Sequence, residues 1–278
     1  MGAVVAQEAS PGGSTSKHWQ KVDEGLYYGE FAASQESEIG DSKITIVKID
    51  PWHYDFKLLS ASEFNDSSRT ARQWAKELHL IAAVNAGMFQ EDFRTSVGYM
   101  KNFDHVNNPR VSKENTFFAF NPVVGVDRLP GDSSQTDSAL KPAQIIDRNC
   151  QDFEDLRRKY HTIFQSIRMI SCTQKNVWSR QPQKWSMAVL GMDKNDNILF
   201  IFTRSPYSVH DFINILLSLP ISIYNAMYLE GGPEATLFFS ANGIEFEKNG
   251  SFESGFIAND SLTAAWPIPN VLGVVKKP

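Results

Sequence analysis

Residues 226–239 read Ala226-Met227-Tyr228-Leu229-Glu230-Gly231-Gly232-Pro233-Glu234-Ala235-Thr236-Leu237-Phe238-Phe239, and the interpretation of the whole chain starts from this stretch. Two apolar runs, each typical of a strand, flank a Gly-Gly-Pro turn that has Glu230 on one side and Glu234 on the other. Because glycine has no side chain, backbone amides at such a turn can approach a ligand closely. The stretch therefore predicts a polar site at the end of a buried strand, although a tight turn with incidental acidic residues has the same pattern.

Size and charge narrow the class of protein. With 278 residues, of which 42% are hydrophobic, the chain can bury the core of one large domain, which we place at residues 17–278. The net charge is −5 and no cluster of basic residues occurs, so we expect no nucleic-acid partner. The longest apolar run, Ile213 to Leu229, is interrupted by Pro220 and Asn225, and we expect no membrane span.

The first 16 residues are predicted to lie outside the folded domain. Residues 1–7 end like the small-residue tail of a signal peptide, and Pro11 to Ser16 is a flexible lead-in. We therefore interpret residues 1–16 as a disordered leader or the remnant of a signal sequence.

The remaining chain alternates strand-like and helix-like segments. Strands are expected at Lys43–Asp50, Asp55–Ser60, Leu80–Val84, Ser186–Asp193 and Ile198–Thr203, and helices at Arg69–His79, at Asp152–His161 and after Ser208. Ser68 and Ser208 are the expected N-caps of the first and last helices. This pattern predicts an α+β fold of mixed, strand-rich twisted sheets with three or four packed helices.

A second candidate site follows the apolar strand Leu80–Val84. This strand leads directly into Asn85-Ala86-Gly87, where Asn85 offers both a donor and an acceptor and Gly87 permits close approach of a ligand. An Asx-turn that simply ends the strand has the same sequence pattern.

Two arginines lie within or directly after apolar runs. Arg168 lies inside Ile163–Ser171, so it needs either an anionic partner, which is the simpler interpretation, or a wet cavity. Arg204 follows the strand Ile198–Thr203. Cys150 and Cys172 either pair in an oxidising compartment or remain free thiols.

Several classes of enzyme lack their sequence signatures here. The six His residues are scattered without metal-ligand spacing, and neither a Gly-x-Ser-x-Gly elbow nor a nucleotide-binding fingerprint occurs. We therefore expect no metal and no cofactor. The remaining polar groups at strand ends are Asn85, Arg168, Arg204, Glu230 and Glu234. Carboxylates combined with arginines suit cleavage of a substrate that contains a sugar and a phosphate.

The order of three stretches resembles the phosphodiester glycosidase family over roughly residues 40–276. The stretches are Ala83-Val84-Asn85-Ala86-Gly87-Met88-Phe89, then Tyr228 to Leu237, and finally Pro269-Asn270-Val271-Leu272-Gly273-Val274, with the Arg204 hairpin before the second. The chain departs from the family pattern at Glu230, where the family has Asp, and at Pro233-Glu234, which replaces Gly-Ser. These departures indicate a divergent branch.

The resemblance implies hydrolysis of the bond between an anomeric carbon and a phosphodiester oxygen, or of a related glycosidic bond. Glu230 would act as base or nucleophile, Asn85 would orient a sugar hydroxyl or water, and Arg204 would stabilise the departing phosphate. Substrate contacts are expected from Gly87, Arg168, Gly231, Gly232, Glu234 and Thr236. The resemblance, together with the signal-like leader, also implies an extracytoplasmic location.

One alternative is a non-catalytic carbohydrate- or cell-envelope-binding domain on the same fold. The substitutions in the Gly-rich turn motivate it, because Pro233 has no N–H and Glu234 would repel a phosphate. A metal-dependent phosphodiesterase is a third possibility, and the sequence offers little support for it.

Overall fold

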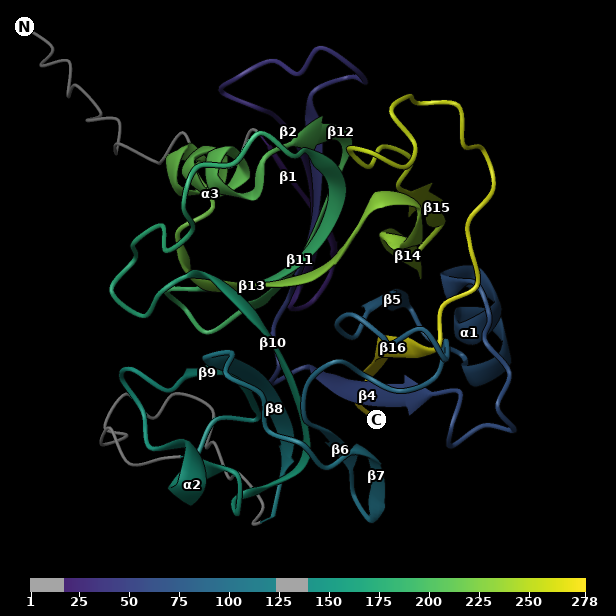
Figure 1. The fold of residues 1–278 in the computed structure, drawn as a ribbon. Coiled ribbons are helices and arrows are strands. Elements are labelled where there is room, and N and C mark those ends of the chain that lie inside the picture. The colour runs from purple at the N-terminus through teal and green to yellow at the C-terminus, as the bar shows by residue number, and fades with distance from the viewer. Residues whose placement is uncertain (1–17, 124–139) are drawn as a thin grey trace, which may run out of the picture.

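Two antiparallel β-sheets, packed face to face, organise the protein (Figure 1). The computed structural model describes residues 18–123 and 140–278, so the expected leader lies outside the described residues. The larger sheet has the strand order β1 (Trp19–Asp23), β2 (Leu26–Ala32), β3 (Lys43–Ile49), β12 (Ile198–Tyr207), β11 (Trp185–Asp193), β13 (Ile223–Gly231), β10 (Tyr160–Ile170), β6 (Met100–Asn102) and β7 (His105–Asn108), and β8 (Thr116–Pro122) pairs with both β10 and β9 (Ala143–Asp147). The smaller sheet has the order β15 (Ile244–Asn249), β14 (Thr236–Ala241), β5 (Ala82–Asn85), β16 (Asn270–Lys276) and β4 (Tyr54–Ser60).

The main core lies between the two sheets. Alternate residues of β11 and β13 point to opposite faces, as strand geometry requires. Leu190 and Met227 enter the core shared with the smaller sheet, where Val84, Leu237 and Leu272 are buried. This shared core makes the two sheets one domain and confirms the expected α+β class.

Helices cover the outer face of each sheet. Helix α3 (Val209–Ser218) buries Phe212 and Leu216 against Val189 and Ile201 of the larger sheet. Its N-cap is Ser208, as predicted, and the Ser208 hydroxyl accepts from the Asp211 N–H. On the other side of the molecule, helix α1 (Ala71–Leu78) packs Trp74 against the smaller sheet.

The start of helix α1 differs from the prediction. Its N-cap is Thr70, because Thr70 and Gln73 form a reciprocal capping box. The hydroxyl of Ser68, which we expected to cap the helix, donates to the carbonyl of Phe93.

The helix predicted at Asp152–His161 is wrong in length. Helix α2 spans only Phe153–Leu156, with Asp152 as its N-cap. The chain then enters β10 at Tyr160, where Tyr160, Thr162 and neighbouring side chains are buried in the sheet. Burial in the sheet prevails over the weak helix preference of this charged segment.

A disulfide joins Cys150, after β9, to Cys172, after β10. The sequence left pairing open, and the structure resolves it. Strands β9 and β10 both pair antiparallel with β8 and so run in the same direction, which brings the residues after them to the same end of the sheet. No helix among the described residues is long and apolar enough to cross a membrane.

Replacing both cysteines by serine is expected to lower the free energy of unfolding by about 3 kcal/mol, because the bond closes a loop of 22 residues in the unfolded chain. Urea denaturation of the double variant Cys150→Ser/Cys172→Ser would measure this loss. Reduced wild-type protein, as the control, should lose the same amount. An unchanged denaturation midpoint in both samples would contradict the prediction.

Candidate functional site

The Gly-Gly-Pro stretch carries the chain from one sheet to the other. Strand β13 of the larger sheet ends at Gly231. A short 3₁₀ helix then covers Gly232–Glu234, and strand β14 of the smaller sheet begins at Thr236. The stretch therefore joins two sheets at their common border, and its turn lies beside both of them.

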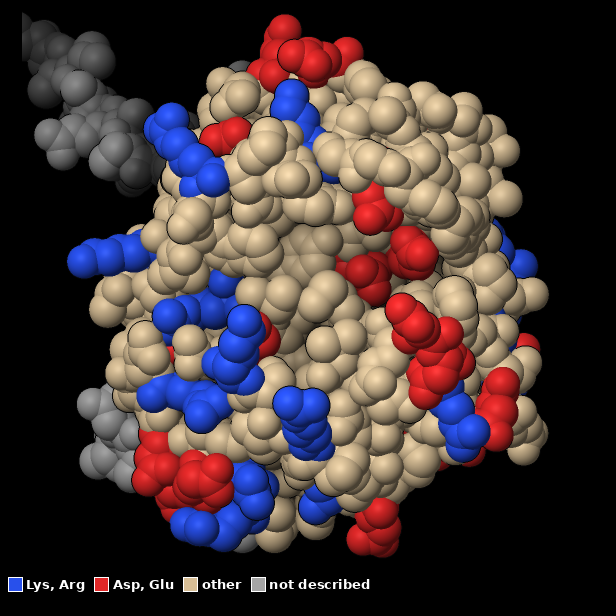
Figure 2. Space-filling view, in the orientation of Figure 1, with Lys and Arg blue, Asp and Glu red and all other residues tan. Residues whose placement is uncertain are grey.

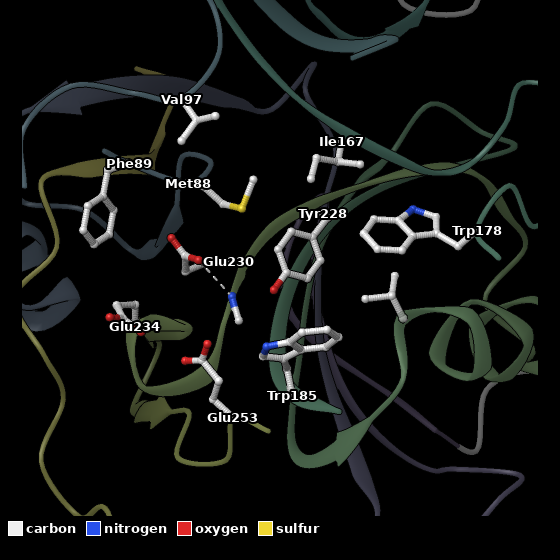
Figure 3. A pocket seen from close by; sticks show the side chains of 12 residues that line it. Met88, Phe89, Val97, Ile167, Trp178, Trp185, Tyr228, Glu230, Glu234 and Glu253 are labelled. Atoms are coloured by element: carbon white, nitrogen blue, oxygen red, sulfur yellow. Dashed lines mark hydrogen bonds between the residues drawn. The ribbon is translucent and has the colours of Figure 1, made fainter. Parts of the chain in front are cut away.

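A β-bulge lies just before this turn. Val189 of β11 pairs with Tyr228 and Ala188 pairs with Glu230, so Leu229 is an extra residue in β13. Bulges bend a strand and redirect its side chains. Tyr228 and Glu230 are two positions apart on β13, so they point to the same side, and both face the same cavity (Figure 3).

Asn85 holds the end of the turn that leads into β14. Its side-chain nitrogen donates to the Glu234 carbonyl at 2.9 Å, and its side-chain oxygen accepts from the Thr236 N–H at 2.8 Å. Asn85 is 1% exposed, and both of these bonds are made to the backbone. In this structure Asn85 is a residue that positions Glu234, and its amide does not face the cavity as the sequence hypothesis required.

A cavity of about 400 Å³ opens where the turn meets the larger sheet. Figure 2 shows a hollow in the middle of this face, with Asp and Glu side chains along its right edge and Lys and Arg side chains on the lower left. The described residues that line the cavity are Met88, Phe89, Val97, Ile167, Trp178, Trp185, Val209, Tyr228, Glu230, Gly231, Glu234 and Glu253. Three carboxylates and four aromatic rings therefore share one cavity.

Glu253 reaches the cavity from a loop after β15. Ser186, at the start of β11, holds this loop, because its hydroxyl accepts from the N–H groups of Ser251 and Phe252 at 3.1 Å each. The same hydroxyl donates to the Arg204 carbonyl at 2.6 Å. Glu253 is thus fixed beside the Gly-rich turn by a buried hydroxyl on another strand.

The two glycines of the turn make room for these side chains. A Cβ on Gly231 would overlap the Tyr228 hydroxyl, and a Cβ on Gly232 would lie 2.6 Å from a Glu253 carboxylate oxygen. Gly232 also has a φ of 67°, which favours glycine. The Gly231 N–H donates to the Glu230 carboxylate at 3.1 Å, so this amide serves Glu230 and not a phosphate.

Burial and mutual repulsion set the protonation of the carboxylates. Burial raises the pKa of Glu230 to about 8, and the nearby Glu234 and Glu253 add to the shift, against the opposing hydrogen bond from the Gly231 N–H. Burial, followed by the charge of Glu253, also raises the pKa of Glu234. Glu230 is therefore mostly protonated at neutral pH and can donate a proton.

Neither of the predicted arginines lines the cavity. The Arg204 guanidinium forms an ion pair with Asp260 at 2.6 Å and donates to the carbonyls of Asn249 and Leu262. Arg168 forms an ion pair with Asp147 at 2.9 Å, which is the simpler interpretation that the sequence offered. The structure therefore does not bring Arg168 and Arg204 together with the carboxylates of the cavity, because each guanidinium is paired elsewhere.

The other predicted residues divide between lining and support. Gly231 and Glu234 line the cavity. Gly87 has a φ of 85° and turns the chain so that the next residues, Met88 and Phe89, reach the cavity wall. Thr236 is buried in β14, where its hydroxyl donates to the Lys248 carbonyl.

Glu253, Trp178 and Trp185 were not among the predicted site residues. Trp185 directly precedes an expected strand, and an aromatic residue at a strand end was an available signal. Glu253 lies in an irregular polar segment, and no local pattern distinguishes it. Among the described residues, no group of three or more His, Cys, Asp or Glu side chains could hold a metal ion.

Comparison with known proteins agrees with this architecture. A model of the family described as phosphodiester glycosidase matches residues 79–275. The fold resembles the catalytic domain of zebrafish N-acetylglucosamine-1-phosphodiester alpha-N-acetylglucosaminidase, auto-inhibited by its pro-peptide, with a TM-score of 0.62 and 12% identity over 91% of this chain and 84% of that one. It also resembles a hypothetical protein from Synechocystis, with a TM-score of 0.58 and 12% identity over 91% of this chain and 62% of that one. At such identities the likeness concerns the fold, and no curated protein sequence matches.

Proposed function

This chain belongs to the phosphodiester glycosidase family, and from that premise we propose that it hydrolyses a bond at the anomeric carbon of a sugar. The bond is that of a sugar-1-phosphodiester or a related glycoside, and the sugar occupies the cavity at the end of β13. The observation that carries the proposal is the meeting of Glu230, Glu234 and Glu253 in one aromatic-walled cavity.

The chemistry of glycoside cleavage calls for this set of groups. Aromatic rings pack against the apolar faces of a sugar, and a pair of carboxyl groups supplies a proton donor and a proton acceptor. Glu230, whose pKa is raised to about 8, donates its proton to the leaving oxygen as the anomeric C–O bond breaks. Glu234 or Glu253 accepts the proton of the attacking water.

The described residues that line the cavity include no cationic side chain that could bind a phosphate leaving group. The phosphate would therefore extend out of the cavity, and the Lys and Arg side chains on the lower left of Figure 2 lie on the same face. Protonation by Glu230 then matters more than it would beside an arginine, because the leaving oxygen receives no cationic assistance within the cavity.

The test is an activity screen of the full chain on 4-nitrophenyl glycosides of both anomeric configurations and on sugar-1-phosphodiesters, with and without EDTA. We expect release of free sugar from at least one substrate, with equal rates in the presence of the chelator. Sugar binding without turnover would instead support the carbohydrate-binding domain, and loss of activity with EDTA would support a metal-dependent phosphodiesterase.

We also propose that the protein acts outside the cytoplasm. The Cys150–Cys172 disulfide supports this location, because such bonds persist in oxidising compartments. Thiol alkylation of denatured protein taken directly from cells would test it. Unmodified cysteines are expected, and quantitative alkylation would contradict an extracytoplasmic location.

A further inference from the structure

We infer that the cavity selects a sugar that carries a positively charged ammonium group. The inference rests on the proposed function, because it takes the cavity for the sugar site, and it names the chemical class of the sugar. Three features of the cavity support it: an excess of carboxylates, a tyrosine hydroxyl that faces the cavity without a hydrogen bond to any described residue, and aromatic walls.

The charge within the cavity is unbalanced. Glu230, Glu234 and Glu253 line it, and none of the described lining residues is Lys, Arg or His. The two arginines that the sequence singled out pair with carboxylates elsewhere, Arg168 with Asp147 and Arg204 with Asp260. A ligand cation would supply the charge that the protein does not.

Tyr228 provides an independent sign of a polar ligand. The residue is only 7% exposed, yet its hydroxyl faces the cavity, and no other described residue forms a hydrogen bond with it. Buried hydroxyl groups normally have a partner, because an unpaired one costs free energy. Figure 3 shows this hydroxyl in the space between Glu230, Trp185 and Glu253, where a bound sugar would meet all three.

The aromatic walls suit an ammonium group as well as a sugar ring. Trp178 and Tyr228 have ring centroids 6.2 Å apart, and Trp185 lines the cavity beside them. The faces of such rings attract ammonium groups, and the attraction strengthens when the ion leaves water. Carboxylates on one side and ring faces on the other therefore suit a cationic sugar.

Anionic and neutral sugars fit this cavity less well. A phosphate within the cavity would be repelled by every ionised carboxylate, and a neutral sugar would leave the carboxylates to repel one another. That repulsion already contributes to the raised pKa values of Glu230 and Glu234, after burial. An ammonium group would relieve it.

The experiment compares binding of three sets of sugars to the full chain by isothermal titration calorimetry at pH 7. The sets are glucosamine, galactosamine and mannosamine; their N-acetyl derivatives; and glucose 1-phosphate. We expect the best amino sugar to bind about tenfold more tightly than its N-acetyl derivative, in line with charge-assisted hydrogen bonds. Glu234→Gln and Glu253→Gln should each reduce this preference several-fold. The matched control is Glu154→Gln on the exposed side of α2, which removes the same charge away from the cavity and should leave the preference unchanged.

The outcomes separate this inference from the proposed function. Equal or tighter binding of the N-acetyl sugars or of the phosphate overturns the inference, and hydrolysis of their glycosides would still uphold the proposed function. Selective binding of amino sugars without hydrolysis of any glycoside supports the inference and overturns the proposed hydrolase. If no sugar in the panel binds, the inference is overturned.

Discussion

Glu230→Gln is expected to lower kcat/KM by about 10²–10⁴-fold on whichever glycoside the wild type cleaves, because glutamine cannot donate the proton that the leaving oxygen needs. The substitution keeps the size of the side chain and an acceptor for the Gly231 N–H, so the fold and the sugar site should remain. Activity on a poor leaving group should fall most, and activity on 4-nitrophenyl glycosides should fall least. Steady-state kinetics on such a pair of substrates measures both effects.

The pH dependence of the hydrolysis rate is a second test of Glu230 as the proton donor. The pKa of Glu230 is about 8, so the wild-type rate should fall as the pH rises through that value and the carboxyl loses its proton. The matched control, Glu154→Gln, should keep both the wild-type rate and this pH profile. Glu230→Gln with full activity, or a wild-type rate that rises above pH 8, would contradict the role of Glu230 as proton donor.

The stability of the protein should change with pH for the same reason. The folded-state pKa of Glu230 lies above its ordinary value of 4.5, so the folded chain binds the proton more tightly than the unfolded chain. The free energy of unfolding should therefore fall as the pH rises from about 4.5 to about 8. Glu230→Gln should lack this contribution and be more stable than the wild type above pH 8, by about 1–3 kcal/mol. Urea denaturation at pH 5 and pH 9 compares the two proteins.

Asn85→Ala is expected to lower the free energy of unfolding by about 2–4 kcal/mol, because it leaves the buried Thr236 N–H and the Glu234 carbonyl without their partner. Enzyme activity should also fall, because without the two Asn85 hydrogen bonds the turn that carries Glu234 is no longer held in place. A merely structural effect would leave the pH profile alone. Displacement of Glu234 should instead shift the activity midpoint below that of the wild type, because Glu234 contributes to the raised pKa of Glu230.

The control for Asn85 is Asn225→Ala. Asn225 is also 1% exposed. It lies near the start of β13, at the end of the strand away from the Gly-rich turn, and its side-chain nitrogen donates one longer hydrogen bond, 3.3 Å, to the Ile145 carbonyl. It should lose less stability and keep the pH profile of the wild type. Equal effects of both substitutions on stability and on the pH midpoint would refute a positioning role for Asn85.

Local patterns predicted much of the fold. The hairpin of β11 and β12, the Ser208 cap of α3 and the strand that ends at Asn85 all follow from alternation, turn residues or capping, which act between near neighbours. The helix expected at Asp152–His161 failed because the choice between helix and strand depended on β8, to which β10 pairs across the sheet. Sequence spacing contains no information about such a partner.

The site shows the same division between short-range and long-range effects. The sequence by itself determined that residues 226–239 form two buried strands around a glycine turn edged by carboxylates, because strand alternation and glycine conformation are properties of adjacent residues. Only the tertiary structure decided which groups meet there. Glu253 joins Glu230 and Glu234 through a loop held by Ser186, while Arg204 turns to Asp260, 56 positions later in the chain. Charge pairing depends on distance in space, and that distance is set by the packing of two sheets.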